Sequence, residues 1–389
     1  MTFPIRPWLL RLHRWAGLGL AGVLALEGVT GSVLAFQGAL DAALNPELFA
    51  ARTAGPALSA DDLLARISAQ SPGADPAYLV FRPPPGRTAQ AFLSALPGSA
   101  PPAQNQLFAD PGSGEVLGRR AYGACCLSRR ALVPFLYTLH RSLMAGATGT
   151  LVLGIAALVW ALDCCAGLAL TLPRAPPRLV RWRATWTLKP GAGAARRELD
   201  LHRAGGLWLW PTLLALAVSG VSLALPTQVF HPTVAALLPV TPPAPARPAA
   251  DTARTRLPLD RLIAEAERDV ASHGGPLPAT TLYRNLQAGT VAVYFFPEPT
   301  LRGTGLGSPS VTLDDSNGAV VKREIPGAGR LGDLFERIQF PLHSGQVAGL
   351  PGRVVIAATG IAVAMLSVTG VMIWERRRRA RRIAAARRA

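Results

Sequence analysis

Four long apolar stretches constrain the fold of this chain more than any other feature of its sequence. They cover residues 15–36, 148–172, 205–225 and 353–374, and each is long enough to cross a bilayer as a helix of about 20 residues. Half of the residues are hydrophobic and only 16% are charged, which excludes a disordered chain. The sequence predicts a membrane α-helical protein. The first stretch is read as a retained span rather than a cleaved signal peptide, because three similar stretches follow it.

The basic residues are spread unevenly over the segments between these spans. Arg and Lys are concentrated in the N-terminal stub, the 174–199 loop and the 376–389 tail, whereas the two long loops are nearly neutral. Positively charged loops stay on the cytoplasmic side. We therefore expect a bacterial inner-membrane protein with both termini in the cytoplasm and both long loops in the periplasm. The net charge of +17 then reflects topology and contact with membrane lipid, and argues against a nucleic-acid partner.

The two long loops are each large enough to fold. In the first, Ser59 and the acidic residues after it predict a helix start, and strand-like runs follow. The second loop repeats this order after a Pro/Ala-rich linker at 239–250, with a helix over 259–270. The predicted organisation is transmembrane helix 1 (1–39), a periplasmic α+β module (40–130), transmembrane helix 2 (131–173), a cytoplasmic basic loop (174–199), transmembrane helix 3 (200–226), a second periplasmic α+β module (227–342), transmembrane helix 4 (343–375) and a basic cytoplasmic tail (376–389).

Each span is associated with one histidine and with a later small-residue element that ends in glycine. The spacing between the two is 18 residues in the first and third spans and 27 residues in the second and fourth. Such matched spacing predicts a duplicated two-helix unit within a four-transmembrane-helix bundle. The pairs are His13 with Gly31, His140 with Gly167, His202 with Gly220, and His343 with Gly370.

The expected topology places these histidines at two depths. His13 and His202 would lie near the cytoplasmic face, and His140 and His343 near the periplasmic face. Two neutral imidazoles from opposite helices suit a six-coordinate haem iron. No Cys-x-x-Cys-His motif is present for covalent attachment. We therefore expect two b-type haems, each with two histidine axial ligands.

Arginines follow three of these histidines directly. Arg14, Arg141 and Arg203 would lie at the membrane surface, where a guanidinium can pair with a haem propionate. The alternative is that juxtamembrane His and Arg residues only anchor helices at the headgroups. That alternative explains any single histidine well, but it does not explain four at repeated spacing.

The Leu-His-Arg motifs, the Val-Thr-Gly and Val-Ser-Gly elements, and the loop turns Asp-Pro-Gly-Ser-Gly-Glu and Asp-Asp-Ser-Asn-Gly together resemble the PepSY-associated transmembrane helix (PepSY_TM) family. Ferric-siderophore reductases of bacterial inner membranes belong to this family, and the resemblance covers nearly the whole chain. It implies PepSY-like outer modules and haem-dependent electron transfer to periplasmic ferric complexes. Carried over by motif, His13, His140, His202 and His343 would be the axial ligands. The fourth motif departs by reading His343-Ser rather than His-Arg.

The function expected from these features is an oxidoreductase that reduces ferric iron, with ferric-siderophore as the favoured substrate. Residues 17–22 match Gly-x-Gly-x-x-Gly, but they lie inside an apolar span without a preceding strand, so a dinucleotide site is not expected. Electrons would come from a separate donor, a quinol or a soluble reductase. One alternative is a haem-free scaffold whose PepSY-like modules bind or regulate an envelope protease. Another keeps the haems but has a different electron acceptor.

Two further features stay open at this point. Glu27 and Asp163 are carboxylates inside spans, where they are expected either to accept a helix-to-helix hydrogen bond or to move protons. Cys125 and Cys126 are adjacent thiols that would form a vicinal disulfide, relay electrons or remain ordinary cysteines. The sequence assigns no catalytic residue and does not identify the siderophore, the donor or the oligomeric state.

Overall fold

The computed structural model divides the chain into two compact units. It describes residues 5–53, 55–96, 98–126, 128–242, 255–296 and 305–388, so most of the predicted Pro/Ala linker lies outside the described residues. The first unit, which we call the helical unit, consists of Met1–Phe36, Tyr137–Thr233 and Leu342–Ala389. The second, the sheet unit, consists of Gln37–Leu136 and Val234–Pro341. Each unit is described by itself.

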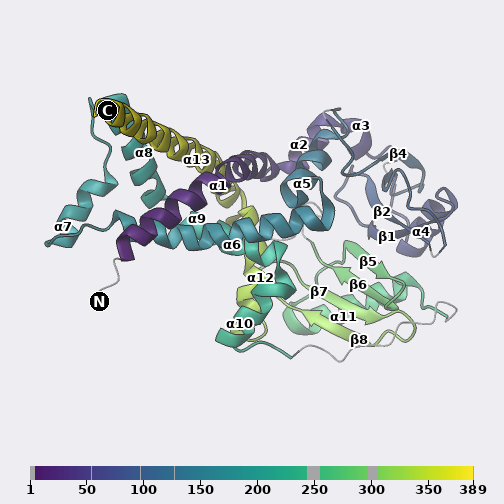
Figure 1. Cartoon of the computed structure of the whole chain (residues 1–389). Coiled ribbons are helices and arrows are strands. Elements are labelled where there is room, and N and C mark those ends of the chain that lie inside the picture. The colour runs from purple at the N-terminus through teal and green to yellow at the C-terminus, as the bar shows by residue number, and fades with distance from the viewer. Residues whose placement is uncertain are drawn as a thin grey trace. The chain divides into compact units, whose positions relative to one another are not determined.

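Among the described residues of the helical unit, three helices are long and apolar enough to cross a membrane: α1 (Ile5–Leu34), α6 (Gly146–Thr171) and α13 (Gly349–Ala386). They expose large apolar side chains such as Leu151, Ile155 and Ile361. α1 packs against α6 and α13, as Figure 1 shows. Because these apolar faces are not covered by protein, lipid is the solvent that suits them.

The third predicted span differs from a straight helix. α8 (Ala194–Trp208) and α9 (Trp210–Ala224) are apolar enough to span only when taken together, and they are bent by 69° at Leu209. Pro211 lies at the start of α9. A proline lacks the N–H that would continue the hydrogen-bond ladder, and its ring clashes with the preceding turn, so it favours a break here. α8 packs on α13, and α9 packs on α6.

α1 and α13 approach each other at two glycines. A Cβ on Gly28 would lie 2.4 Å from the Gly360 carbonyl oxygen, and a Cβ on Gly360 would lie 2.4 Å from the Gly28 carbonyl oxygen. One turn along α1, the Ser32 hydroxyl donates to the Ala357 carbonyl at 2.7 Å. Small residues and hydrogen bonds of this kind hold helices together in lipid, where apolar side chains gain little from leaving the solvent.

Shorter helical segments complete the chain. They are α2 (Gln37–Leu44), α3 (Pro46–Phe49), α4 (Ala60–Ala69), α5 (Leu132–Ser142), α7 (Arg178–Arg183), α10 (His231–Leu237), α11 (Leu259–Gly274) and α12 (Leu331–Ser344), with single turns at Ala184–Trp186, Pro226–Phe230 and Gln346–Ala348.

In the part of the sheet unit that the structure describes, eight strands form one antiparallel sheet in the order β4-β3-β2-β1-β5-β6-β7-β8; all of them except β3 are labelled in Figure 1. The first four strands come from the first long loop and the last four from the second. Their bounds are β1 (Ala74–Val80), β2 (Ala89–Ala95), β3 (Gln106–Ala109), β4 (Val116–Arg120), β5 (Thr281–Asn285), β6 (Thr290–Tyr294), β7 (Ser310–Asp314) and β8 (Val320–Glu324).

The two loops therefore share a sheet, whereas the sequence predicts two separate modules. The junction is the antiparallel pair β1–β5, in which Leu79 lies opposite Leu282. The sequence does not predict β5, so this pairing is not foreseen. Leu79, Leu282, Leu63 of α4 and Leu262 of α11 all belong to one buried core, which explains why the halves join. An exposed β1 edge would also leave its N–H and C=O groups without sheet partners.

α4 and α11 cap each other across this junction. Asp61 of α4 accepts from the Leu259 and Asp260 N–H groups at 2.8 and 2.9 Å. In return, Asp260 of α11 accepts from the Ala60 N–H at 2.9 Å. A carboxylate is stabilising at a helix N-terminus because the first N–H groups have no partner within the helix. The expected N-cap Ser59 is also present and accepts from the Asp62 N–H.

Candidate functional site

The helical unit brings the four predicted histidines together in two pairs. The ring centroids of His13 on α1 and His202 on α8 lie 6.1 Å apart, and the ring planes are inclined by 58°. His140 at the end of α5 and His343 at the end of α12 are also 6.1 Å apart, at 57°. We call these the His13/His202 pair and the His140/His343 pair. The two pairs thus have nearly the same geometry.

The helices that carry His140 and His343 end within a few residues after these histidines. After His140, Leu143 and Met144 adopt positive φ before α6 begins. After His343, Gly345 has φ 76° and ends α12, and a Cβ there would lie 2.5 Å from the Gly352 carbonyl oxygen. Glycine is therefore required at residue 345 for both its backbone conformation and its close approach. Each of these histidines is held in the last turn of a short helix that leads into a long one.

In the His13/His202 pair, the Nδ1 atom of each ring has a fixed partner. His13 Nδ1 lies 2.9 Å from the Asp163 carboxylate on α6. His202 Nδ1 lies 3.0 Å from the Leu366 carbonyl and 3.1 Å from the Thr369 hydroxyl, both on α13. Each ring is thus oriented by a helix other than the one that carries it.

The His140/His343 pair follows the same arrangement. His140 Nδ1 lies 2.9 Å from the Thr30 hydroxyl and 2.9 Å from a Glu27 carboxylate oxygen, both on α1. His343 Nδ1 lies 2.9 Å from the Ser219 hydroxyl on α9. The other carboxylate oxygen of Glu27, Oε1, is buried without a hydrogen-bond partner in the described structure.

These contacts determine which nitrogen carries the proton. A carboxylate or carbonyl can only accept, so Nδ1 of His13 and of His202 is the donor. The Thr30 and Ser219 hydroxyls give their own protons to the Leu26 and Leu216 carbonyls, so they accept from the imidazoles as well. The assignment is Nδ1–H in all four rings, and it leaves the Nε2 lone pair of each ring as the available ligand.

Three of the predicted small-residue glycines lie against the imidazoles. A Cβ would lie 3.0 Å from His140 Cε1 if built on Gly31, 3.4 Å from His13 Cε1 on Gly167, and 3.2 Å from His202 Cε1 on Gly370. Gly220 differs, because its nearest contact is the Ala157 side chain at 3.2 Å. The glycines therefore let a neighbouring helix approach the ring edge, a role that the spacing alone does not specify.

The paired rings fit a shared metal with two nitrogen ligands. An imidazole nitrogen lies about 1.1 Å from its ring centre and binds a metal at about 2 Å, so rings on opposite sides of one metal have centroids about 6 Å apart. Both pairs show 6.1 Å. Among the described residues, no group of three or more His, Cys, Asp or Glu side chains is placed to hold an ion. A haem needs only two axial ligands from the protein, and these pairs supply that donor set.

The predicted arginines differ in their surroundings. Arg14 and Arg141 are exposed, which leaves them accessible to an anion. Arg203 instead donates to Asp200 at 2.9 Å, and its Nε is buried without a partner in the described structure. A fourth arginine, Arg353 on α13, donates to the Ala35 carbonyl at 2.6 Å and stacks on Phe36. Arg203 is therefore held mainly by its own helix.

Sequence reasoning missed the hydroxyl partners. Thr30, Ser219 and Thr369 each immediately precede one of the four glycines, and this shared position was the signal that could have identified them. In the remaining element Ala166 occupies that position, and the Asp163 carboxylate one turn earlier binds the imidazole instead. Of the two interpretations of Glu27 and Asp163, the helix-to-helix hydrogen bond is present for Asp163, and a Glu27 carboxylate oxygen lies 2.9 Å from His140 Nδ1.

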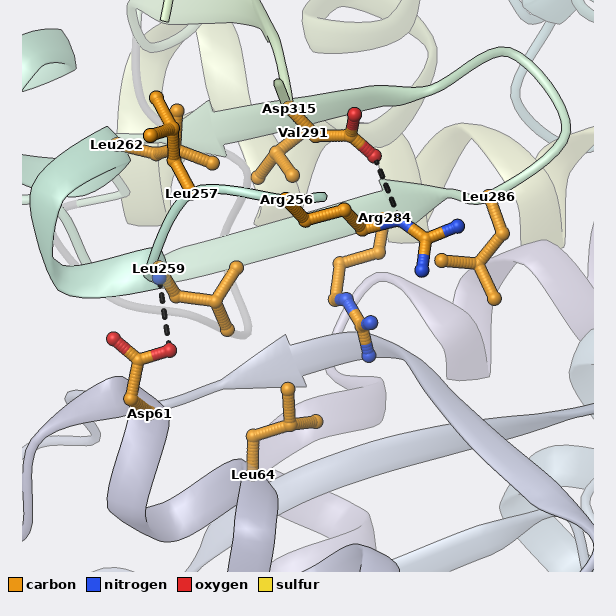
Figure 2. A pocket seen from close by; sticks show the side chains of 10 residues that line it. All are labelled: Asp61, Leu64, Arg256, Leu257, Leu259, Leu262, Arg284, Leu286, Val291 and Asp315. Atoms are coloured by element: carbon orange, nitrogen blue, oxygen red, sulfur yellow. Dashed lines mark hydrogen bonds and ion pairs between the residues drawn. The ribbon is translucent and has the colours of Figure 1, made fainter. Parts of the chain in front are cut away.

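A small cavity of about 110 Å³ lies in the sheet unit, between α4, α11 and β5. Figure 2 shows Asp61 bonded to the Leu259 N–H and Arg256 paired with Asp315 at its wall. Arg284 also lines it and donates to Asp75 at 2.7 Å. Burial raises the pKa of Asp75, although Arg284 opposes this. Because these charged groups are paired, the cavity is a structural junction.

The fold and the paired histidines together define a membrane protein in which apolar helices position imidazoles and a separate antiparallel sheet forms a second unit. The chain belongs to the PepSY_TM family: the family model for the PepSY-associated TM region matches residues 10–377, nearly the whole length. Comparison with curated proteins finds no match.

Proposed function

We propose that this protein holds two b-type haems and transfers electrons across the inner membrane to ferric iron in the periplasm. The observation that carries this proposal is the pair of matched histidine sites, with ring centroids 6.1 Å apart and every Nδ1 engaged. His13 and His202 would hold one haem, and His140 and His343 the other. When bound, a haem supplies a reversible one-electron Fe(III)/Fe(II) couple.

The proposal includes four spans built from a duplicated two-helix unit, with both termini in the cytoplasm. The repeated contacts support it, because the imidazoles of both halves are bound by residues one to four positions before equivalent glycines. α8 and α9 would together form the third span. The arginine-rich end of α13, which continues to Ala386, supports a cytoplasmic C-terminus because positive segments remain on that side.

The helices would hold the two haem sites apart and surround them with apolar side chains. α1 carries His13 of one pair and Thr30, which binds His140 of the other. These residues are 17 positions apart on one continuous helix, which corresponds to about 25 Å. The two pairs are therefore at different depths along α1. Apolar faces on α1, α6 and α13 keep water and ions from the hydrocarbon layer between them.

The overall reaction is a one-electron reduction. Each ferric ion takes one electron and becomes ferrous, while the donor is oxidised. A quinol releases two electrons and two protons and so reduces two ferric ions, whereas a soluble one-electron reductase serves one ion at a time. Ferrous iron is held less well than ferric iron by hard oxygen ligands, so reduction would release it from a siderophore or similar chelate. The protein needs no acid or base side chain for this step.

A visible spectrum of the purified full chain tests the proposal. We expect a Soret band and, after reduction, sharp bands at about 550–560 nm that are typical of bis-histidine haem b, with two haems per chain. His13→Ala and His140→Ala should each remove one haem. His273→Ala is the matched control, because His273 is an exposed residue of α11 in the sheet unit, and it should keep both. A colourless wild-type protein would contradict the proposal.

The same samples separate the rival functions. A haem-free scaffold that binds or regulates an envelope protease does not require paired imidazoles with fixed Nδ1 atoms. To identify the acceptor, the reduced protein is freed of reductant and mixed with a panel of ferric chelates. Reoxidation of the bands, with ferrous iron trapped by a colorimetric chelator, is expected. Reoxidation by a disulfide or by Cu(II), but not by any ferric chelate, would assign the electrons to a different acceptor.

A further inference from the structure

The two imidazoles of each pair have chemically different partners. In the His13/His202 pair, His13 is bonded to the Asp163 carboxylate, whereas His202 is bonded to a carbonyl and a hydroxyl. In the other pair, His140 Nδ1 is bonded to the Thr30 hydroxyl and lies 2.9 Å from a Glu27 carboxylate oxygen. His343 is bonded to the Ser219 hydroxyl. Each pair thus combines one ring that faces a carboxylate with one that faces neutral groups.

Orienting an imidazole does not require a charged partner. His202 and His343 are oriented by neutral groups, and the Thr30 hydroxyl already orients His140 at 2.9 Å. Yet the side chains of Asp163 and Glu27 are only 11% and 18% exposed, and a carboxylate in an apolar helix is costly. What Asp163 and Glu27 add beyond a hydroxyl is negative charge at Nδ1–H.

The two carboxylates occupy equivalent positions. Glu27 lies four residues before Gly31 on α1, and Asp163 lies four residues before Gly167 on α6. The corresponding residue on α13, four positions before Gly370, is Leu366, and there the backbone carbonyl binds the imidazole. Both carboxylates therefore lie in the first half of the chain, while each acts on a different pair.

We infer that Asp163 and Glu27 are positioning residues that lower the reduction potential at the two histidine pairs, Asp163 at His13/His202 and Glu27 at His140/His343. This inference rests on the proposed function. A carboxylate that accepts from Nδ1–H makes Nε2 a stronger electron donor, and a stronger donor favours Fe(III) over Fe(II). A low potential at both depths favours electron transfer to ferric chelates, which are difficult to reduce.

The test uses two nearly isosteric variants, Asp163→Asn and Glu27→Gln, in the full-length haem-loaded protein. Both keep an oxygen that can accept from Nδ1–H but lose the charge. Loss of such a partner typically changes metal affinity 10- to 100-fold. If the affinity of the site for Fe(III) falls while its affinity for Fe(II) is unchanged, each tenfold loss of Fe(III) affinity raises the one-electron potential by about 59 mV. Potentials are read by spectroelectrochemical titration of the reduced bands.

Position-specific shifts are the expected result. Asp163→Asn should raise one of the two potentials and Glu27→Gln the other, and the double variant should raise both. Ser367→Ala is the matched control, since the Ser367 hydroxyl donates to the Val363 carbonyl of its own helix, and it should leave both potentials nearly unchanged.

The contrary outcomes are distinguishable. Variants that bind two haems and titrate at the wild-type potentials would overturn the inference and leave the proposed function standing. A variant that no longer folds would show that its carboxylate holds helices together rather than tuning a ligand, and would also overturn the inference. A wild-type protein without haem would overturn the proposed function and this inference together.

Discussion

The close approach of α1 and α13 at Gly28 allows a quantitative test of the helical unit. In Gly28→Ala, the new Cβ would lie 2.4 Å from the Gly360 carbonyl oxygen and 3.3 Å from the Ala364 nitrogen. Carbon and carbonyl oxygen atoms normally come no closer than about 3.3 Å. Both obstacles are backbone atoms, which cannot rotate away as a side chain would. The helices must therefore separate by about 1 Å at this crossing.

That separation has a calculable cost. The bond from Ser32 to the Ala357 carbonyl, now 2.7 Å, would lengthen to about 3.6 Å, beyond hydrogen-bonding distance. Its loss costs about 1 kcal/mol, and overpacking costs about 1–3 kcal/mol more. We expect Gly28→Ala to lower the free energy of unfolding by about 2–4 kcal/mol. The shift should also disturb the Thr30–His140 bond, so the haem proposed for the His140/His343 pair should be lost first.

The assay is equilibrium unfolding of the full chain in mixed detergent micelles, followed by tryptophan fluorescence. Gly22→Ala is the matched control: it lies on the same helix, and apart from the adjoining backbone of that helix its added Cβ meets no described atom within 4 Å. Replacing glycine by alanine in an unobstructed helix interior stabilises by about 0.5–1 kcal/mol, so this variant should be at least as stable as the wild type. Equal stability of the two variants would refute the close α1–α13 crossing.

Three further predictions concern the sheet unit. Burial raises the pKa of Asp110, but hydrogen bonds from Thr53, Arg52 and Ser113 outweigh it and hold the pKa below its usual range. The ionised Asp110 carboxylate therefore stabilises the fold fully above about pH 4, and this contribution is lost as the pH falls further. Asp110→Asn should unfold at neutral pH more easily than the wild type, and its stability should depend less on acid pH in unfolding measurements. Asp61→Ala, which removes the cap of α11, should cost about 1 kcal/mol in chemical denaturation; no loss would contradict the reciprocal caps. Arg120→Met should cost about 3–5 kcal/mol in the same assay, because it leaves the buried Asp41 charge without its guanidinium partner, and a neutral effect would place Asp41 in solvent.

The sequence was sufficient for the features that depend on local pattern. Long apolar runs predicted α1, α6 and α13, and the helix predicted over 259–270 corresponds to α11 (Leu259–Gly274). The repeat of histidine and glycine singled out the four rings that the structure places in pairs. Each of these depends on residues close together in the chain, where periodicity and spacing carry the information.

The features that were missed depend on contacts between distant segments. β5 is short, and its residues Tyr283, Arg284 and Asn285 are not fully buried, so its sequence lacks the apolar run of a buried strand. It is a strand because β1 and β6 pair with its two edges. Likewise, Asp163 could be recognised as unusual but not as the partner of His13, since that requires the relative rotation of α1 and α6. The bend at Leu209 had a local signal in Pro211, which the apolar run obscured.

Each histidine pair is formed by one residue from each half of the chain, and this has a consequence for cutting the chain into two fragments. His13 and His140 lie before the 174–193 connection, and His202 and His343 lie after it. A protein cut within that connection would yield two fragments, each with one member of each histidine pair and neither with a complete pair. The cut would also open β1 on one fragment and β5 on the other as bare edges. The two fragments would have to associate to restore either the histidine pairs or the eight-stranded sheet, so neither half of the chain is expected to function alone.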